Sequence, residues 1–125
     1  GYAVDFLGTS PERMREIWDE IDSTNVRAPY LLSHVFMRGI AAAVEKGSAR
    51  GGAIVNIGSL GGIRGTQKFP GLSAYVASKF AIAGMTEALA VEGKSIGVRV
   101  NAVAPGAVAT EMLRKAAPHL RTETL

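Results

Sequence analysis

Apolar and polar positions first follow the period of a helix and then give way to short runs rich in apolar residues. The segment 11–46 follows a hydroxyl cap, Ser10, and opens on a proline and an acidic residue, which together are typical of a helix start. Gly47 and Ser48 end it. An apolar stripe along its first part is expected to face the core. That stripe consists of Met14, Ile17, Trp18 and Ile21.

The run 53–57 is short, apolar and β-branched, which is the pattern of a buried strand in a parallel sheet, and the run 98–103 is also strand-like. Between them we expect a long loop over 58–72 and a helix over 73–93. A mostly helical segment follows at about 110–117. Strands that alternate with helices predict an α/β fold with right-handed crossovers.

The candidate chemistry centres on Tyr75 and Lys79, which stand four residues apart and therefore share one face of the long apolar helix. An ammonium beside a phenol favours the phenolate, so Tyr75 is a candidate acid/base. Ser59 follows the carboxyl end of the first strand, where active groups of open α/β sheets lie. Pro105 and Gly106 follow the second strand and begin a loop.

Asn25 and Pro29 form a second pair at a spacing of four residues. Proline has no N–H, so Pro29 cannot donate a hydrogen bond to the carbonyl of Asn25. We therefore expect the helix to be kinked here and the Asn25 carbonyl to be free.

Four motifs follow one another along the chain: WDEIDSTNV (18–26), IVNIGS (54–59), SAYVASK (73–79) and VNAVAPGAVAT (100–110). In this order they resemble those of the short-chain dehydrogenase/reductase family. The resemblance implies a Rossmann-like, doubly wound parallel sheet that is incomplete in this chain. It also implies an oxidoreductase that uses NAD or NADP to interconvert a carbonyl and an alcohol.

The resemblance further implies a catalytic set of Asn25, Ser59, Tyr75 and Lys79. Tyr75 would exchange a proton with the substrate oxygen, Ser59 would hold that oxygen, and Lys79 would stabilise the phenolate and bind the nicotinamide ribose. Asn25 would hold a water that connects Lys79 with solvent. The implied cofactor contacts are Tyr75, Lys79, Pro105, Gly106, Val108 and Thr110.

Each of these assignments has a plainer alternative. Tyr75 and Lys79 would be ordinary helix residues without the flanking motifs, and Ser59 would merely end a strand. Asn25 would be a polar group that interrupts a helix, and Thr110 would cap the next helix.

The stretch from Ser59 to Tyr75 is a few residues longer than the family pattern. We expect the extra residues to lie at 66–69 and to enlarge a loop beside the substrate. Ser73 is the other serine near Tyr75, but it lies on a different face of the helix, so Ser59 remains the candidate.

Composition narrows the function classes. A chain of 125 residues that is 47% hydrophobic and 20% charged is typical of one globular domain. Its 14 basic residues are scattered and the net charge is only +3, so we expect no nucleic-acid-binding arm. The absence of cysteine excludes disulfides and thiolate metal sites, and His34 and His119 have no metal-ligand partners. Without a run of about 18 apolar residues, we expect no membrane span. The absence of cysteine suits a cytoplasmic location, which we expect.

The chain lacks the family's glycine-rich turn between a strand and a helix, and also its final strand. We therefore interpret residues 1–125 as the central and catalytic part of a single NAD(P)-binding Rossmann-fold domain in a longer enzyme. The alternative is a truncated or non-catalytic scaffold that does not bind the dinucleotide by itself. A sugar-nucleotide epimerase or dehydratase is a further alternative. The resemblance implies a small-molecule alcohol or ketone as substrate, and a homodimer or homotetramer formed through helices 11–46 and 73–93.

Overall fold

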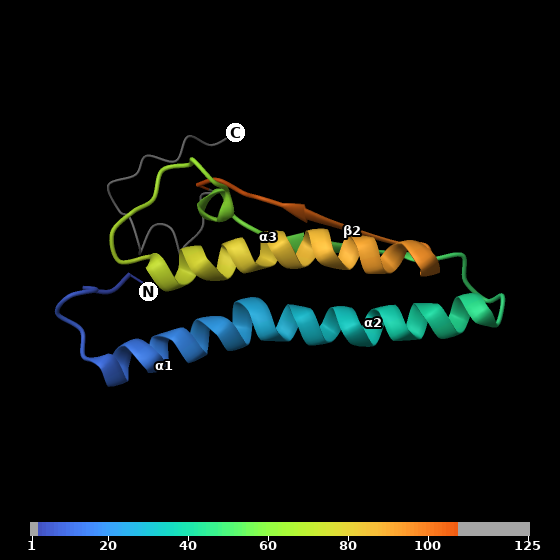
Figure 1. Ribbon diagram of the computed structural model, residues 1–125, viewed down its shortest axis with the longest axis horizontal. Helices are drawn as coiled ribbons and strands as arrows, with labels where there is room; N and C mark the ends of the chain where they lie inside the picture. Colours follow the sequence, from blue (N-terminus) through green and yellow to red (C-terminus); the bar gives the residue numbers. More distant parts are fainter. Residues whose placement is uncertain (1–2, 108–125) are drawn as a thin grey trace.

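The computed structural model describes residues 3–107, in which three long helices accompany two strands. In Figure 1 α1 and α2 form an almost continuous rod, α3 lies along that rod, and the strands run along α3. The elements are α1 (Pro11–Asp22), α2 (Ala28–Glu45), β1 (Gly52–Ile57), α3 (Ser73–Gly93) and β2 (Val98–Val103). Three short turns connect them: a π-helical turn at Ser23–Arg27, and 3-10 turns at Leu60–Gly62 and Lys94–Ile96.

The two strands form a parallel pair, with Gly52 opposite Val98 and Ile57 opposite Val103. The two predicted strands and the helix between them are therefore confirmed. The bounds of α3 and β2 are those predicted, and β1 begins one residue earlier than predicted. Both α2 and α3 pack on one face of this sheet. The core there combines buried Leu89, Val98 and Val100 with Met37, Ile40, Ile54, Met85, Ala90 and Ile96.

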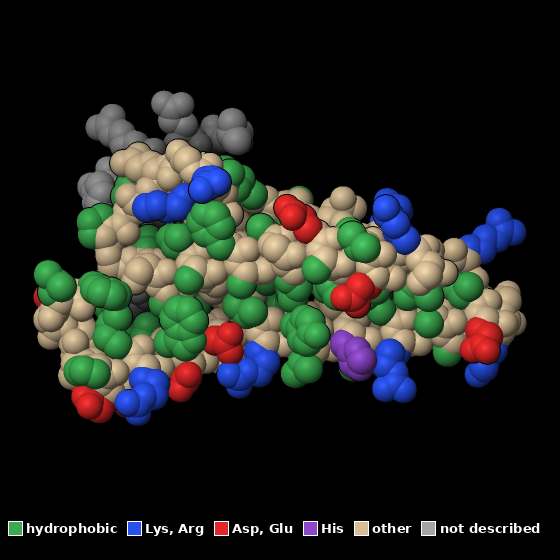
Figure 2. Space-filling view, viewed as in Figure 1, with side chains coloured by type: hydrophobic (Ala, Val, Ile, Leu, Met, Phe, Trp, Pro, Cys, Tyr) green, Lys and Arg blue, Asp and Glu red, His purple; other side chains and the backbone are tan. Residues whose placement is uncertain are grey.

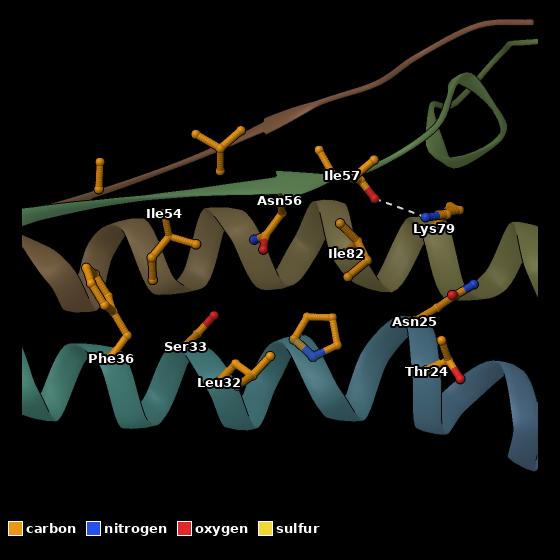
Figure 3. A pocket seen from close by; sticks show the side chains of 13 residues that line it. Thr24, Asn25, Leu32, Ser33, Phe36, Ile54, Asn56, Ile57, Lys79 and Ile82 are labelled. Atoms are coloured by element: carbon orange, nitrogen blue, oxygen red, sulfur yellow. Dashed lines mark hydrogen bonds between the residues drawn. The ribbon is translucent and has the colours of Figure 1, made fainter. Parts of the chain in front are cut away.

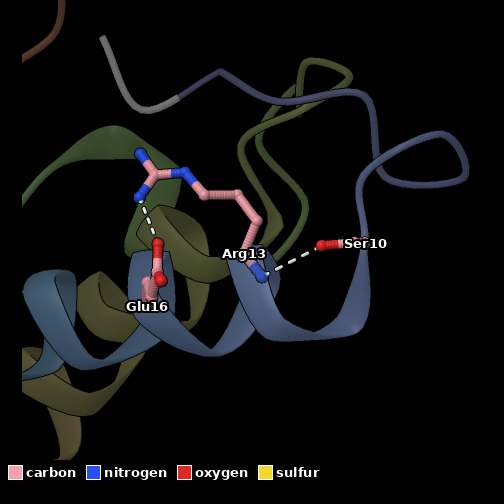
Figure 4. Close-up of polar contacts among 3 residues, drawn as sticks. All are labelled: Ser10, Arg13 and Glu16. Atoms are coloured by element: carbon pink, nitrogen blue, oxygen red, sulfur yellow. Dashed lines mark hydrogen bonds and ion pairs between the residues drawn. The ribbon is translucent and has the colours of Figure 1, made fainter.

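The start of α1 follows the predicted capping pattern. The hydroxyl of Ser10 accepts a hydrogen bond from the backbone N–H of Arg13 at 3.3 Å, and the Arg13 guanidinium pairs with Glu16 one turn later at 2.7 Å (Figure 4). A cap of this kind satisfies an N–H that has no partner within the helix. The helix therefore begins where the sequence predicts.

The predicted core stripe of α1 is correct for two residues and wrong for Trp18. Ile17 and Ile21 are buried at 6% and 2% exposure, whereas Trp18 is 51% exposed. Residues four apart share a helix face, while the next residue lies about 100° further round. Only the face that carries Ile17 and Ile21 is turned towards the core, and Trp18 lies beside it.

The single helix expected over 11–46 is in fact interrupted by the π-helical turn at Ser23–Arg27. The backbone N–H of Ala28 bonds the carbonyl of Ser23, five residues back. Pro29 follows at once, and because it lacks an N–H the regular ladder cannot pass through it. The helix is therefore irregular at Asn25, where a kink was predicted. The irregularity takes the form of a wider, π-helical turn. A free Asn25 carbonyl stays a prediction.

The segment 58–72, expected to be a loop throughout, contains the 3-10 turn Leu60–Gly62. Before β2, Gly97 adopts a left-handed backbone with φ of 69° and ends the turn Lys94–Ile96. Only glycine adopts that conformation without steric cost, so Gly97 aims the chain into β2. The predicted helix at 110–117 lies outside the described residues.

The segment Ser73–Ile96 is long and apolar enough, by length and composition alone, to cross a membrane. The core helix of a soluble protein meets the same criterion. This segment holds buried Ser78 and Thr86, and its helix α3 packs against β2 and the turn Leu60–Gly62. The sequence-based expectation of no membrane span remains a prediction.

Candidate active site

The loops that leave the carboxyl ends of β1 and β2 are tied together. The N–H of Gly58 donates to the carbonyl of Val103 at 2.7 Å, and the N–H of Leu60 donates to the carbonyl of Pro105 at 3.1 Å. A Cβ added to Gly106 would lie 3.2 Å from Leu60 Cδ1. Pro105 and Gly106 are therefore placed against the loop that carries Ser59, at the edge of the sheet where open α/β folds hold their ligands.

Ser59 stands at the start of the 3-10 turn, with an extended backbone. Its Oγ accepts a hydrogen bond from the N–H of Gly61 at 3.1 Å. A hydroxyl that accepts through a lone pair keeps its proton for donation to another oxygen. Ser59 is thus held as a donor whose oxygen is fixed by the backbone.

Tyr75 lies in the first turn of α3, and its ring comes close to Gly61, as Ser59 does. A Cβ built on Gly61 would lie 3.4 Å from Ser59 Oγ and 3.8 Å from Tyr75 Cε1. Both side chains therefore lie beside the place that a side chain at position 61 would occupy. The fold brings together two candidates that are separated by a loop and a turn.

Lys79 lies one helical turn after Tyr75. Its Nζ is 5.6 Å from the centroid of the Tyr75 ring and donates a hydrogen bond to the carbonyl of Ile57 at 3.0 Å (Figure 3). That distance allows a cation–π attraction. The bond to Ile57 connects α3 to the end of β1. Burial lowers the pKa of Lys79 below its ordinary value of 10.5.

This lowered pKa predicts a pH-dependent difference in stability between the protein and its Lys79→Met variant. In the window between the lowered pKa and 10.5, the unfolded chain binds the Lys79 proton more tightly than the folded chain does. Stability contributed at Lys79 therefore rises with pH across that window. Denaturant unfolding of both proteins should show the difference moving in favour of wild type as pH increases. A difference that is flat across the window would contradict burial of the ammonium.

A groove of about 510 Å³ lies between α2, β1 and α3. Figure 3 shows Asn25 and Lys79 at one end of it, with Phe36 and Ile54 at the other. Asn25 comes from the π-helical turn, and its Nδ2 donates to Ser78 Oγ at 3.1 Å. The groove therefore joins the interrupted helix to the helix that carries Tyr75 and Lys79.

The structure thus gathers Asn25, Ser59, Tyr75 and Lys79 at one edge of the sheet, although their catalytic roles remain predictions. Pro105 and Gly106 are adjacent to them. Val108 and Thr110, predicted to contact the cofactor, lie outside the described residues.

Sequence reasoning missed two residues that shape this site. A Cβ on buried Gly62 would lie 2.5 Å from the carbonyl oxygen of Lys79, so the loop after β1 touches the backbone of α3 here. The glycine-rich stretch after β1 was the available signal. Ser78 is buried between Tyr75 and Lys79, and nothing in its sequence context pointed to its contact with Asn25.

Comparison with known proteins agrees with this geometry. A profile of the short chain dehydrogenase family matches residues 6–121. Galactitol 2-dehydrogenase (L-tagatose-forming) of Cereibacter sphaeroides is 46% identical over 99 residues, which cover 78% of this chain and 36% of that protein. The 3-oxoacyl-[acyl-carrier-protein] reductase FabG of Chlamydia muridarum is 36% identical over 110 residues, covering 88% and 41% respectively.

Among solved structures, the 3-ketoacyl-(acyl-carrier-protein) reductase from Brucella melitensis, complexed with NADH, superimposes with a TM-score of 0.72. It is 30% identical, and the match covers 89% of this chain and 42% of that one. The chain spans about two fifths of the length of the curated relatives it matches. The family profile and the shared Rossmann-like architecture show that this chain belongs to the short-chain dehydrogenase family.

Proposed function

We propose that the protein is an NAD(P)-dependent oxidoreductase that interconverts a carbonyl and an alcohol. One observation carries the proposal: the Lys79 ammonium lies 5.6 Å from the centre of the Tyr75 ring, and Ser59 and Tyr75 both lie within 4 Å of a Cβ built on Gly61. An acid/base, a cation beside it and a fixed hydroxyl donor are the groups that a carbonyl oxygen needs when its charge changes.

In the direction of carbonyl reduction, Tyr75 gives its phenolic proton to the substrate oxygen. Ser59 donates a hydrogen bond to the same oxygen, and because its own Oγ is held by the Gly61 N–H this donor is positioned before the substrate arrives. The Lys79 ammonium stabilises the phenolate that remains. In the direction of alcohol oxidation the same groups act in reverse.

The nicotinamide of bound NAD or NADP supplies or accepts the hydride. Lys79 is suited to bind the ribose of such a cofactor. Its ammonium lies in the lining of the groove and can donate hydrogen bonds to the ribose hydroxyl groups. Pro105 and Gly106 offer backbone next to Ser59, and Gly106 has no side chain to block close approach. We assign the remaining contacts to Val108 and Thr110.

We also assign to Asn25 the water that connects Lys79 with solvent. Asn25 and Lys79 line the same groove. We propose that the proton that restores the phenol after reduction, or leaves it after oxidation, passes between Tyr75 and solvent through Lys79 and this water. The amide of Asn25 donates to Ser78, and in this proposal the backbone carbonyl of Asn25 would hold the water.

Hydrogen bonds made by residues 66–69 are consistent with the expected enlarged loop beside the substrate. The hydroxyl of Thr66 donates to the carbonyl of Leu60 at 2.6 Å, and Lys68 Nζ donates to the carbonyl of Ile63 at 2.8 Å. These bonds fold the extra residues back onto the turn after Ser59. We therefore propose that they form one wall of a site for a small-molecule alcohol or ketone.

The proposal is tested on the full-length protein by titration with NADH and NADPH, followed by turnover with a panel of ketones. We expect saturable binding of one nucleotide and its oxidation when a ketone is present. If neither nucleotide binds, the protein is the non-catalytic scaffold considered above.

For assembly we propose a homodimer or homotetramer that uses α2 and α3. Figure 2 shows hydrophobic side chains gathered along the seam of these two helices. The exposed large hydrophobic residues of α2 and α3 are Tyr30, Leu31, Leu32, Val35, Phe36, Phe80 and Val91. Light scattering of the same preparation should report a dimer or tetramer, and a monomer at micromolar concentration would contradict this part. A cytoplasmic location and the absence of nucleic-acid binding stay predictions.

A further inference from the structure

Two hydrogen bonds join the π-helical turn to the backbone of Tyr75 through a single buried hydroxyl. Ser78 is only 5% exposed. Its Oγ receives the Nδ2 of Asn25 at 3.1 Å and donates to the carbonyl of Tyr75 at 2.7 Å. Asn25 and Ser78 are 53 residues apart in sequence, so this contact is a purely tertiary link.

The direction of both bonds follows from the chemistry of the groups. The Tyr75 carbonyl can only accept, so the one hydroxyl proton of Ser78 must point at it. Ser78 can then only accept from Asn25, and the amide must turn its NH₂ towards the hydroxyl. The orientation of the Asn25 amide is therefore decided by Ser78, and its oxygen is turned away from that hydroxyl.

We propose that Ser78 is a positioning residue, which locks the Asn25 amide and couples the π-helical turn to the helical turn that carries Tyr75 and Lys79. The inference rests on the proposed function for these residues. Ser78 directly precedes Lys79 and stands three residues after Tyr75, so a shift of its backbone moves both. Because Ser78 is buried, water cannot readily replace its hydroxyl as a hydrogen-bond partner when the hydroxyl is removed by mutation.

The same helix provides a matched control in Thr86. Its Oγ1 receives the Nδ2 of Asn56 at 2.9 Å and donates to the carbonyl of Ile82 at 2.7 Å. Thr86 is 8% exposed, so its environment is close to that of Ser78. It differs in lying two helical turns further along α3, away from Tyr75 and Lys79.

The test compares Ser78→Ala, Ser78→Thr and Thr86→Val in the full-length protein. We expect Ser78→Ala to lower kcat about tenfold, because small displacements of reacting groups have effects of this size, with the KM for the nucleotide changed by less than about twofold. Ser78→Thr keeps the hydroxyl and should recover most of kcat. Thr86→Val should lower the midpoint of denaturation while kcat per folded molecule is kept.

A second readout does not depend on turnover. Hydrogen exchange of the Asn25 side-chain amide, followed by NMR, should accelerate in Ser78→Ala and stay unchanged in Thr86→Val. Wild type that fails to turn over any ketone would refute the proposed function, and the exchange measurement would still decide the link. Unchanged Asn25 exchange in Ser78→Ala overturns the inference. So does a kcat loss in Thr86→Val that equals the loss in Ser78→Ala.

Discussion

Replacing Tyr75 by phenylalanine is expected to lower kcat about a thousandfold, because the substrate oxygen then loses its proton donor. Phenylalanine keeps the ring that lies 5.6 Å from the Lys79 ammonium, so the packing of α3 should be retained. The nucleotide should still bind, since Lys79 is unchanged. Steady-state kinetics of the full-length protein, with nucleotide titration of the variant, measure both effects.

Tyr30→Phe is the matched control for this experiment. Tyr30 lies on α2, is 54% exposed and belongs to the surface proposed for assembly, so loss of its hydroxyl removes the same atom outside the catalytic set. Its kcat should equal that of wild type. A Tyr75→Phe variant that keeps more than about a tenth of the wild-type kcat would refute the assignment of Tyr75 as acid/base, given the usual size of such effects.

Gly62→Ala is expected to have the second-largest effect on kcat. The substitution changes no catalytic group and acts only by displacing the loop that carries Ser59. A Cβ at Gly62 would lie 2.5 Å from the carbonyl oxygen and 2.6 Å from the carbonyl carbon of Lys79. Those atoms belong to the backbone of α3 and cannot turn aside, so the loop must move away. Ser59 stands three residues earlier in that loop and moves with it. We expect kcat to fall about a hundredfold and stability to fall by about 1–3 kcal/mol.

Gly84→Ala separates this contact from the general effect of adding a methyl group. Gly84 lies in the same helix as Lys79, and a Cβ there would meet nothing within 4 Å. Alanine in a helix interior is favoured over glycine by about 0.5–1 kcal/mol, so this variant should be at least as stable as wild type. If Gly62→Ala were as active and stable as Gly84→Ala, the contact between the loop and α3 would not position Ser59.

The local sequence pattern was sufficient to predict those helices and strands whose ends are set by residues close to them in sequence. The capping of α1 by Ser10 and the bounds of α3 and β2 were all predicted, because caps, helical periodicity and β-branched runs act within a few residues. The interruption at Asn25 was predicted for a similar reason, since Pro29 removes a hydrogen bond that belongs to its own helix. The form of that interruption, a π-helical turn, was not predicted.

Local pattern failed where the outcome depends on which face of an element meets another. Trp18 fits the helical stripe of α1 but is half exposed, because the stripe is wider than the face turned to the core. The turn Leu60–Gly62 was missed within a stretch read as loop. It is held from outside that stretch by the bond from Leu60 to Pro105.

The sequence by itself determined the class of fold, the order of strands and helices, and the residue types that could perform the chemistry, since these follow from local spacing. The tertiary structure decided which of them meet. Ser59 and Tyr75 both come close to Gly61 because the loop after β1 packs on α3, and Asn25 reaches Ser78 only because α3 packs beside the π-helical turn. Contacts between distant parts of the chain depend on how whole elements pack, and no local pattern of residues encodes that packing.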